Sequence, residues 1–524
     1  MNKTTTIALL LTLLTLAGPV LASDNPALDA CRRGDILPIE LPPAMEQAAS
    51  PGAAGGAALK QNAGSAEALL GFAQYDGDYW LALGIGATFK IKAAKLKVGV
   101  QIPLKFRVYD QEPKSDSPWY YREEDWDEFS DWLKIIRFVQ YAEERDPFYA
   151  RLGEFGGSNI GHGTILGRYY NNLELDHFHI GLDTKVNLDE GGGEFLVNDM
   201  LVWNLVGIRG YFRPFQVFLK DKAPAITKKL AFGMSFITDY RAPNIPKLAV
   251  DPSDPSKFVY ATDKFDIQEF HREVAWMYGF DIELEVYKSE HILVLPYLDI
   301  NTMRFETGGS HLGLLNNFLF LGTKLELRTE YRMMGKRYSP VYFNALYDLE
   351  RVSFLPIGGL SNLAVDGGTG AAATADLTGP VVPKYHYLMK ANDWMDADLK
   401  FRHGLYGELF WLIGEKFGIG GSYEDYQGAF NTSWMLRAHI IKLFDAISAS
   451  AYLTRRNFDG LGDVDSLDRA FLIAEARWYF SKPFFLYGQF QRYWQLVDDP
   501  DADAGKGYET ADTYNVGVGV SFTF

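Results

Sequence analysis

The sequence predicts an all-β protein that folds as a single antiparallel, up-and-down barrel spanning a membrane. Apolar and polar residues alternate over long stretches, the N-terminus has the form of an export signal, and no later apolar run is long enough for a membrane-spanning helix. A strand points successive side chains to opposite faces, so this alternation gives each strand one apolar and one polar face. Strands that cross a bilayer as a closed barrel have this pattern.

The first 22 residues have the three parts of a secretory signal peptide. Lys3 supplies the positive charge, residues 7–16 form a short apolar region, and Val20-Leu21-Ala22 offers small residues for cleavage after Ala22. A membrane anchor would need about 20 apolar residues. Lipid attachment at Cys31 fits poorly, because the apolar region ends well before it and Asp29 lies two residues ahead. We therefore expect export and cleavage.

Composition limits the remaining classes. The chain has 524 residues, and no linker divides it after residue 66, so one large barrel accounts for the length. Aromatic residues make up 15%, which is typical of strands and of the girdles at membrane interfaces. The net charge of −16 argues against a nucleic-acid partner. A single cysteine allows no internal disulfide. Residues 23–65, rich in Ala, Gly and Pro, are predicted to be a periplasmic tail or small plug, and residues 66–524 the barrel.

Alternation is clearest from Lys95 to Val108, where apolar residues are interleaved with four cationic side chains. A soluble β-sandwich also alternates, but its strands average about 5–6 residues, whereas many of these stretches are about twice as long. The polar faces are predicted to line a lumen, because large barrels are too wide for wall side chains to fill. The predicted channel-lining residues are Lys95, Lys97, Lys105, Arg107, His177, His179, Asp183, Lys185, Asp281, Glu283, Glu285, Lys324, Glu326, Arg328, Glu330, Arg332, Glu475 and Arg477.

Rows of cations and anions on different strands favour a water-filled channel that aligns small polar solutes. The alternative, favoured for any single residue, is that the charges pair across neighbouring strands and close the interior. We keep both interpretations at this point.

The last strand is apolar on one face and carries Gly, Ser and Thr on the other. It resembles the C-terminal assembly signal of bacterial outer-membrane β-barrel proteins, which ends in an aromatic residue. The resemblance covers the last eleven residues and implies a Gram-negative outer membrane, with its lipids, its lipopolysaccharide and the barrel-insertion machinery as partners. The residues that carry it are Tyr514, Val516, Val518, Val520, Phe522 and Phe524.

Counting strands backwards from Phe524 predicts 18 strands, with 16 to 20 allowed. The count places long outside loops at residues 241–271, 305–319 and 355–403, and a short inside turn at 335–339. Residues 147–172 are predicted to form either two strands or one strand followed by an inward-folded loop.

A glycine-rich segment contains Ser158, Asn159 and His162. These residue types resemble the Ser-His-Asn set of outer-membrane phospholipases, but their order is reversed here. A structural turn is the favoured interpretation, because glycine permits positive φ. His177 and His179 could share a metal only with a third ligand from another strand. The sequence therefore predicts no enzyme, no cofactor and no metal site.

The expected function is a porin-like channel for passive or selective diffusion of small polar solutes. The main alternative is a closed or plugged barrel with a structural or surface-binding role through its long loops. An outer-membrane lipid hydrolase is a distant third. The oligomeric state and the solute stay open.

Overall fold

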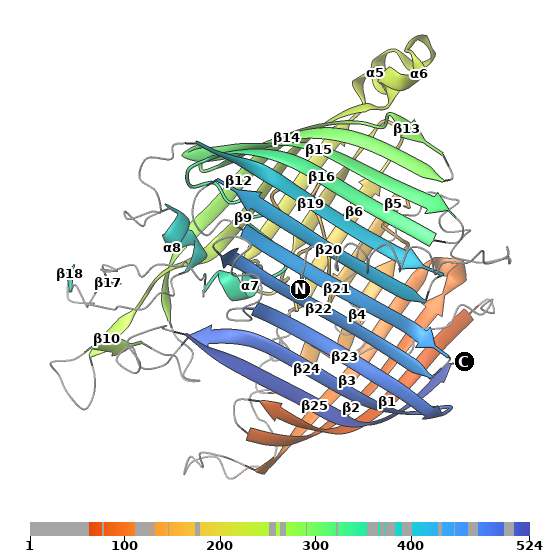
Figure 1. Cartoon of the computed structure of the whole chain (residues 1–524), viewed down its shortest axis with the longest axis vertical. Coiled ribbons are helices and arrows are strands. Elements are labelled where there is room, and N and C mark those ends of the chain that lie inside the picture. The colour runs from red at the N-terminus through yellow and green to blue at the C-terminus, as the bar shows by residue number, and fades with distance from the viewer. Residues whose placement is uncertain are drawn as a thin grey trace, which may run out of the picture.

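The protein is described by a computed structural model, which is an antiparallel β-barrel (Figure 1). No helix in the part of the chain described below is long and apolar enough to cross a membrane. The described residues are 62–75, 78–109, 126, 132–144, 146–172, 179–250, 258–261, 269–289, 291–320, 323–352, 354, 365–366, 372–373, 383–389, 401–414, 416–427, 432–444, 446–458, 470–496 and 508–523.

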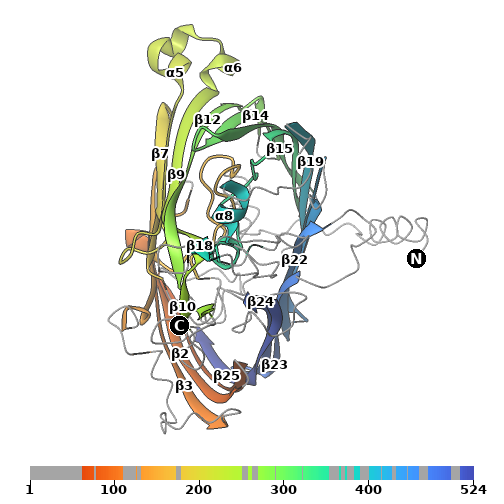
Figure 2. The same ribbon diagram turned by 90° about the vertical axis from the view of Figure 1, so that its left-hand side faces the viewer.

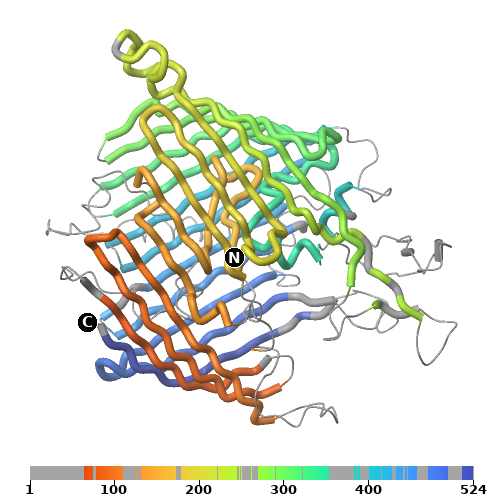
Figure 3. Tube along the Cα trace, turned by 180° about the vertical axis from the view of Figure 1, so that it is seen from behind, coloured from red at the N-terminus to blue at the C-terminus, as the bar shows by residue number. Residues whose placement is uncertain are grey.

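Twenty wall strands pair with their neighbours in sequence order, and β1 pairs with β25 to close the barrel. The short β13 (Tyr287–Lys288) continues β12 along β14 and adds no further wall position. Figure 3 shows the wall opposite to that of Figure 1. The wall strands are β1 (Asn62–Tyr75), β2 (Asp78–Ile91), β3 (Leu96–Tyr109), β4 (Ile136–Tyr141), β5 (Phe148–Gly153), β6 (Gly181–Asn187), β7 (Gly191–Val197), β8 (Leu205–Phe212), β9 (Leu230–Pro246), β12 (Phe270–Leu284), β14 (Ile292–Met303), β15 (Thr307–Phe320), β16 (Thr323–Gly335), β19 (Phe401–Ile413), β20 (Phe417–Tyr426), β21 (Thr432–Leu443), β22 (Ile447–Phe458), β23 (Ala470–Ser481), β24 (Phe484–Leu496) and β25 (Tyr508–Thr523).

The predicted class is confirmed, but the predicted count of 18 strands is wrong: there are 20, the upper limit of the range that was allowed. The uncertainty lay in the N-terminal part of the barrel. There β4 and β5 have six residues each, and β6 and β7 have seven each. So few residues show only about three full alternations, which a loop can match by chance.

The two faces of the wall differ as the alternation predicts. Outward side chains are apolar and exposed: Leu405 is 65% exposed and Phe72 is 63% exposed. Inward side chains are polar and buried, and Arg332 and His311 have no exposed surface. An apolar exterior around a polar interior is the architecture of an outer-membrane barrel, and the reverse of a soluble sandwich.

The predicted outside loop at 305–319 is wrong, because β15 occupies most of it as a wall strand. Its Thr-Gly-Gly-Ser start is typical of a loop, but the small residues have a packing role. A Cβ added at Gly309 would lie 2.6 Å from the ring of Tyr338. The wall therefore carries glycine where an aromatic side chain from inside the barrel presses against it.

The two ends of the barrel are defined by the chain termini. We call the end where β1 begins and β25 ends the terminal rim, and the opposite end the loop rim. The connection from β8 to β9 at the terminal rim forms a small helical hairpin, labelled in Figures 1 and 2. Its elements are α5 (Pro214–Phe218), η3 (Lys220–Lys222) and α6 (Ala225–Lys228).

Two connections at the loop rim fold into the lumen. We call residues 154–172 the first inner segment, and residues 336–352 with α8 (Lys384–Met389) the second inner segment. The latter includes α7 (Tyr347–Glu350). Figure 2 shows α8 within the ring of strands. The other described elements are η1 (Lys92–Ala94) at the terminal rim, and the paired strands β10 (Leu248–Val250) with β11 (Phe258–Tyr260) and β17 (Val365–Asp366) with β18 (Ala372–Ala373).

The two inner segments contact each other directly. Leu166 and Phe343 form a parallel β-bridge, supported by backbone hydrogen bonds of 2.9–3.0 Å that Val341, Phe343 and Gly167 donate. Both residues belong to a buried apolar cluster that also includes wall side chains such as Met277. The region 147–172 is therefore one strand plus an inward-folded loop, one of the two predicted alternatives. The predicted turn at 335–339 is instead the entry of the second inner segment.

Candidate functional site

Most of the predicted channel-lining residues lie on the inner face, where they are paired with opposite charges. Asp281 accepts two hydrogen bonds from Arg209, at 3.0 and 2.6 Å. Arg477 contacts Glu475 at 2.6 Å and Glu67 at 2.8 Å. Lys324 contacts Glu326 at 2.8 Å. The charges are thus tied to each other, which was the alternative favoured for single residues.

The cations nearest the terminal rim are more exposed. Lys95 lies in the turn before β3 with a left-handed backbone and contacts Asp146 at 3.1 Å. Lys97 pairs with Glu143, and Lys185 with Glu144.

Other predicted residues of this part of the barrel lie toward the loop rim. Lys105 and Arg107 are half-buried along β3, and Arg107 lies 3.2 Å from Asp78. His179 precedes β6, with its backbone N–H donated to Asn172, and His177 lies outside the described residues.

The glycine-rich motif of the first inner segment anchors that segment to the wall. Gly161 and Gly163 both have positive φ, which lets the chain reverse tightly enough to present His162 to the wall. One ring nitrogen of His162 lies 2.8 Å from Asp299, and the other lies 3.0 Å from Glu283. The imidazole also stacks on Tyr297, with ring centroids 4.1 Å apart.

Further hydrogen bonds from the same motif fix the segment on both sides. The Ser158 hydroxyl donates to Asp183 at 2.7 Å, and the Thr164 hydroxyl donates to Asp299 at 2.5 Å. The Gly161 N–H donates to Glu194 at 2.9 Å. Asp183, which was predicted to line a channel, therefore holds the first inner segment in place together with Glu194 and Asp299, which were not predicted.

Two carboxylates make His162 a cation at neutral pH. Burial alone would lower the pKa of His162, but Asp299 and Glu283 outweigh it and raise the pKa to about 10. A free imidazole has a pKa of about 6.5. The protonated ring can donate from both nitrogens, which matches the presence of an acceptor on each side.

We expect His162→Gln to remove a pH-dependent part of the stability. Because the folded-state pKa is raised, the stabilisation is complete below about pH 6.5 and is lost as the pH rises through about 10. Thermal unfolding between pH 6 and 10.5 should show a gap between wild type and variant that narrows with rising pH. His291→Gln, at an exposed position, is the control. A gap independent of pH would contradict the prediction.

Besides the contacts of His162, the inner face has a hub of buried charge at Glu330 on β16. Its side chain has no exposed surface, and it accepts hydrogen bonds from the Tyr297 hydroxyl at 2.5 Å and from Arg332 Nε at 2.6 Å. It also contacts Arg328 and His311. One carboxylate therefore neutralises part of the charge of two buried guanidinium groups.

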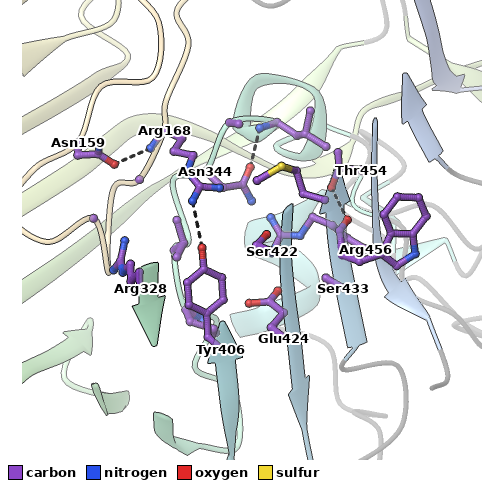
Figure 4. Close-up of a pocket in the computed structure, with 18 of the residues that line it drawn as sticks. Asn159, Arg168, Arg328, Asn344, Tyr406, Ser422, Glu424, Ser433, Thr454 and Arg456 are labelled. Carbon is purple, nitrogen blue, oxygen red and sulfur yellow. Dashed lines mark hydrogen bonds between the residues drawn. The ribbon is translucent and has the colours of Figure 1, made fainter. Parts of the chain in front are cut away.

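Beside this hub, the inner segments leave a pocket against β16 and β19–β22 (Figure 4). Its ionisable lining consists of four cations and one carboxylate, and the cations come from both the first inner segment and the wall. Asn159, Asn344, Ser422, Ser433 and Thr454 add neutral hydrogen-bonding groups. The ionisable residues are Arg168, Arg328, Arg332, Arg456 and Glu424.

The arginines are held from behind by carboxylates outside the pocket. Arg168 pairs with Glu408 and donates to the Tyr406 hydroxyl at 3.1 Å, as Figure 4 shows for the tyrosine. Arg456 lies 3.3 Å from Glu350 of α7. Three arginine nitrogens are buried without a hydrogen-bond partner in the described structure, Arg328 Nη2, Arg332 Nη2 and Arg456 Nε, although Arg328 Nη2 forms an ion pair with Glu330. The lining of the pocket therefore carries an excess of positive charge.

Sequence reasoning found Arg328 and Arg332 but not Arg168, Arg456 or Glu424. The wall members were detectable, since Glu424 follows Ser422, and Arg456 follows Thr454, at the two-residue spacing of one strand face. Arg168 carries no such signal, because it lies in a loop whose inward path depends on distant partners.

The Ser158, Asn159 and His162 set does not form a hydrolase site in this structure. The Ser158 hydroxyl is directed to Asp183, and both His162 nitrogens face carboxylates, so neither group is placed to activate the other. Within the described residues, no group of three or more His, Cys, Asp or Glu side chains could hold a metal ion.

Comparisons with known proteins give only distant similarities. No protein-family model and no curated protein matches the chain. Among solved structures, a mutant of the ferric enterobactin receptor PfeA from Pseudomonas aeruginosa is 10% identical over 89% of this chain and 81% of its own, with a TM-score of 0.31. OccK5 (OpdH) from the same organism and OccAB4 from Acinetobacter baumannii are each 8% identical, cover 89% of this chain and 99% of their own, and have TM-scores of 0.30. Scores of this size carry no argument about function.

Proposed function

We propose that the protein is a bacterial outer-membrane channel for selective diffusion of small polar solutes, and that it favours anionic ones. The arginine-lined pocket between the inner segments and the wall carries this proposal. A pocket with four cations and one carboxylate attracts a carboxylate- or phosphate-bearing solute, and its neutral donors and aromatic walls suit the rest of a small organic molecule. In the proposed orientation the terminal rim faces the periplasm, and the signal peptide and the assembly signal at Phe524 stay predictions.

The inner segments support selectivity rather than free diffusion. An open barrel of 20 strands would leave a wide aqueous channel. Here two segments narrow the lumen and bring Arg168 opposite Tyr406 on the wall. A solute that passes along this side of the lumen meets fixed donors at close range, which is how short filters discriminate by charge.

A second candidate function rests on the same segments. Their apolar cluster, with buried residues such as Phe343 and Tyr347, would suit a plugged barrel that acts through its surface. Recording from the mature protein in a planar lipid bilayer separates the two candidates. Single-channel steps from a heat-modifiable, folded sample support the channel, and their absence supports the plugged barrel.

If the channel conducts, the pocket should set its selectivity. We expect Arg168→Gln with Arg456→Gln to shift the reversal potential in a tenfold KCl gradient toward cation preference, and to weaken block of the current by phosphate about tenfold or more. This reflects the loss of two charge-assisted donors, each worth at least about 1 kcal/mol.

Arg492→Gln is the matched control. Arg492 pairs with Asp512 on the neighbouring strand and does not line the pocket, so its replacement removes an arginine charge elsewhere in the barrel. Equal shifts for the pocket variant and the control would show that the pocket does not lie on the conducting path.

A further inference from the structure

The helical hairpin between β8 and β9 differs in charge from the rest of the protein. Residues 213–229 contain five basic side chains and one acidic one, a formal charge of +4, within a chain whose net charge is −16. The acidic residue is Asp221, and the basic residues are Arg213, Lys220, Lys222, Lys228 and Lys229. A local excess of this size, opposite in sign to the whole, marks a surface suited to an anionic partner.

The same hairpin exposes large apolar side chains. Phe218 is 76% exposed, Leu219 is 43% exposed and Ile226 is 42% exposed. Phe218 and Leu219 directly precede Lys220 in the chain. Exposed apolar residues beside lysines are the pattern of an element at a membrane interface, where the apolar groups enter the acyl boundary and the cations meet phosphates.

The position of the hairpin selects the lipid rather than a soluble partner. In Figures 1 and 2 the α5 and α6 ribbons lie beyond the outline of the barrel wall, where β9 begins. Figure 2 looks into the ring of strands, so the hairpin lies to the side of the barrel and not over its opening. Around an embedded barrel, that side is occupied by lipid, and the terminal rim lies near the headgroups.

The base of the hairpin is fixed to the wall while its tip is free to meet lipid. Arg213 donates hydrogen bonds of 3.2 Å to the carbonyls of Leu188 and Asp189 in the connection between β6 and β7. Lys229 lies 2.8 Å from Glu285 at the end of β12. Lys220 and Lys222, near the tip, are exposed. The tip is thus presented in one orientation, which lowers the entropy lost on binding.

From these observations we infer that residues 213–229 form a lipid-binding element for anionic phospholipids, with Phe218 and Leu219 inserted at the acyl boundary and Lys220 and Lys222 on the headgroup phosphates. The inference uses the membrane placement proposed above but not the solute pathway. It assigns to one side of the barrel a contact made by a helical element outside the wall.

The test places an environment-sensitive fluorophore at the tip. Phe218→Cys is combined with Cys31→Ser, which removes the other cysteine, and the full mature protein is folded into vesicles. The vesicles contain phosphatidylethanolamine with or without phosphatidylglycerol. Quenching is compared between lipids that carry a nitroxide near the headgroup and aqueous iodide. Heat-modifiability confirms insertion first, so that failure of membrane placement is distinguished from failure of the inference.

We expect the label at 218 to be quenched at least about threefold more by the lipid-borne quencher than by iodide, with the difference growing when phosphatidylglycerol is present. Lys220→Glu with Lys222→Glu should abolish that growth. Leu436→Cys, on the outward face of β21, is the lipid control, and Glu143→Cys, whose exposed side chain pairs with Lys97, is the aqueous control.

Iodide quenching equal to that at position 143 in an inserted sample would overturn the inference. Protection of the label only after a soluble acidic protein is added would overturn it as well, and would assign the hairpin to a protein partner. Equal quenching by the lipid-borne nitroxide in vesicles with and without phosphatidylglycerol would contradict the assignment to anionic headgroups.

Discussion

Replacing Glu330 by alanine is expected to lower the free energy of unfolding by about 3–5 kcal/mol, because removing one partner leaves buried charges uncompensated. Glu330 has no exposed side-chain surface and contacts Arg328, Arg332 and His311. Glu330→Gln keeps the shape but not the charge, and should lose much of the same stability. Both losses would appear as a lower urea midpoint for the shift from the folded to the unfolded gel band.

The matched control is Glu143→Ala. Glu143 is 66% exposed and pairs with Lys97 near the terminal rim, so its loss should cost less than about 1 kcal/mol. If Glu330→Ala and Glu143→Ala had similar midpoints, the charges around Glu330 would have to be solvated, and the inner face would be wetter than its packing indicates.

Gly207→Val should displace the first inner segment and raise the single-channel conductance. A Cβ at Gly207 would lie 2.2 Å from Cδ1 of Ile160, so a side chain there requires Ile160, which is buried in the apolar cluster, to shift. Overpacking of this kind costs about 1–3 kcal/mol, which the segment can escape by moving away from β8. Conductance should rise by about twofold or more, and anion preference should fall because Arg168 moves with the segment.

Gly210→Val provides the control on the same strand, since a Cβ there meets nothing within 4 Å. It should leave conductance unchanged. Unchanged conductance for Gly207→Val in a folded sample would mean that the first inner segment does not limit the pathway.

The barrel could be predicted because each strand can be recognised from its own alternation of apolar and polar residues. Alternation from Leu96 to Val108 needs no knowledge of neighbours, and the structure confirms that its apolar side chains face outward. The inner segments could not be recognised in this way, and the reason is physical. Residues 336–352 bury aromatic side chains on several sides inside a lumen, so they show neither the period of a strand nor that of a long helix.

The site was predicted in part for the same reason. Glu283 lies on the inner face, but its partner His162 lies 121 residues away in the chain. The glycine-rich motif was interpreted as a structural turn, and the turn is real. What it holds together depends on Asp183, Glu194 and Asp299, which are set in place only by the closed wall.

The pairing of β1 with β25 has a consequence for biosynthesis. Ser65 to Gln74 pair with Tyr514 to Thr523, and the Arg477–Glu67 contact near this seam joins residues 410 positions apart. The pairing of β1 along one edge is therefore completed only after β25 has been synthesised. Until then both strands present unpaired backbone edges, which are templates for aggregation, and contacts of such high order form slowly. A chain cut short near its C-terminus would therefore remain an open sheet with two unpaired edges. We expect such a chain to depend on chaperones that prevent aggregation before the barrel closes.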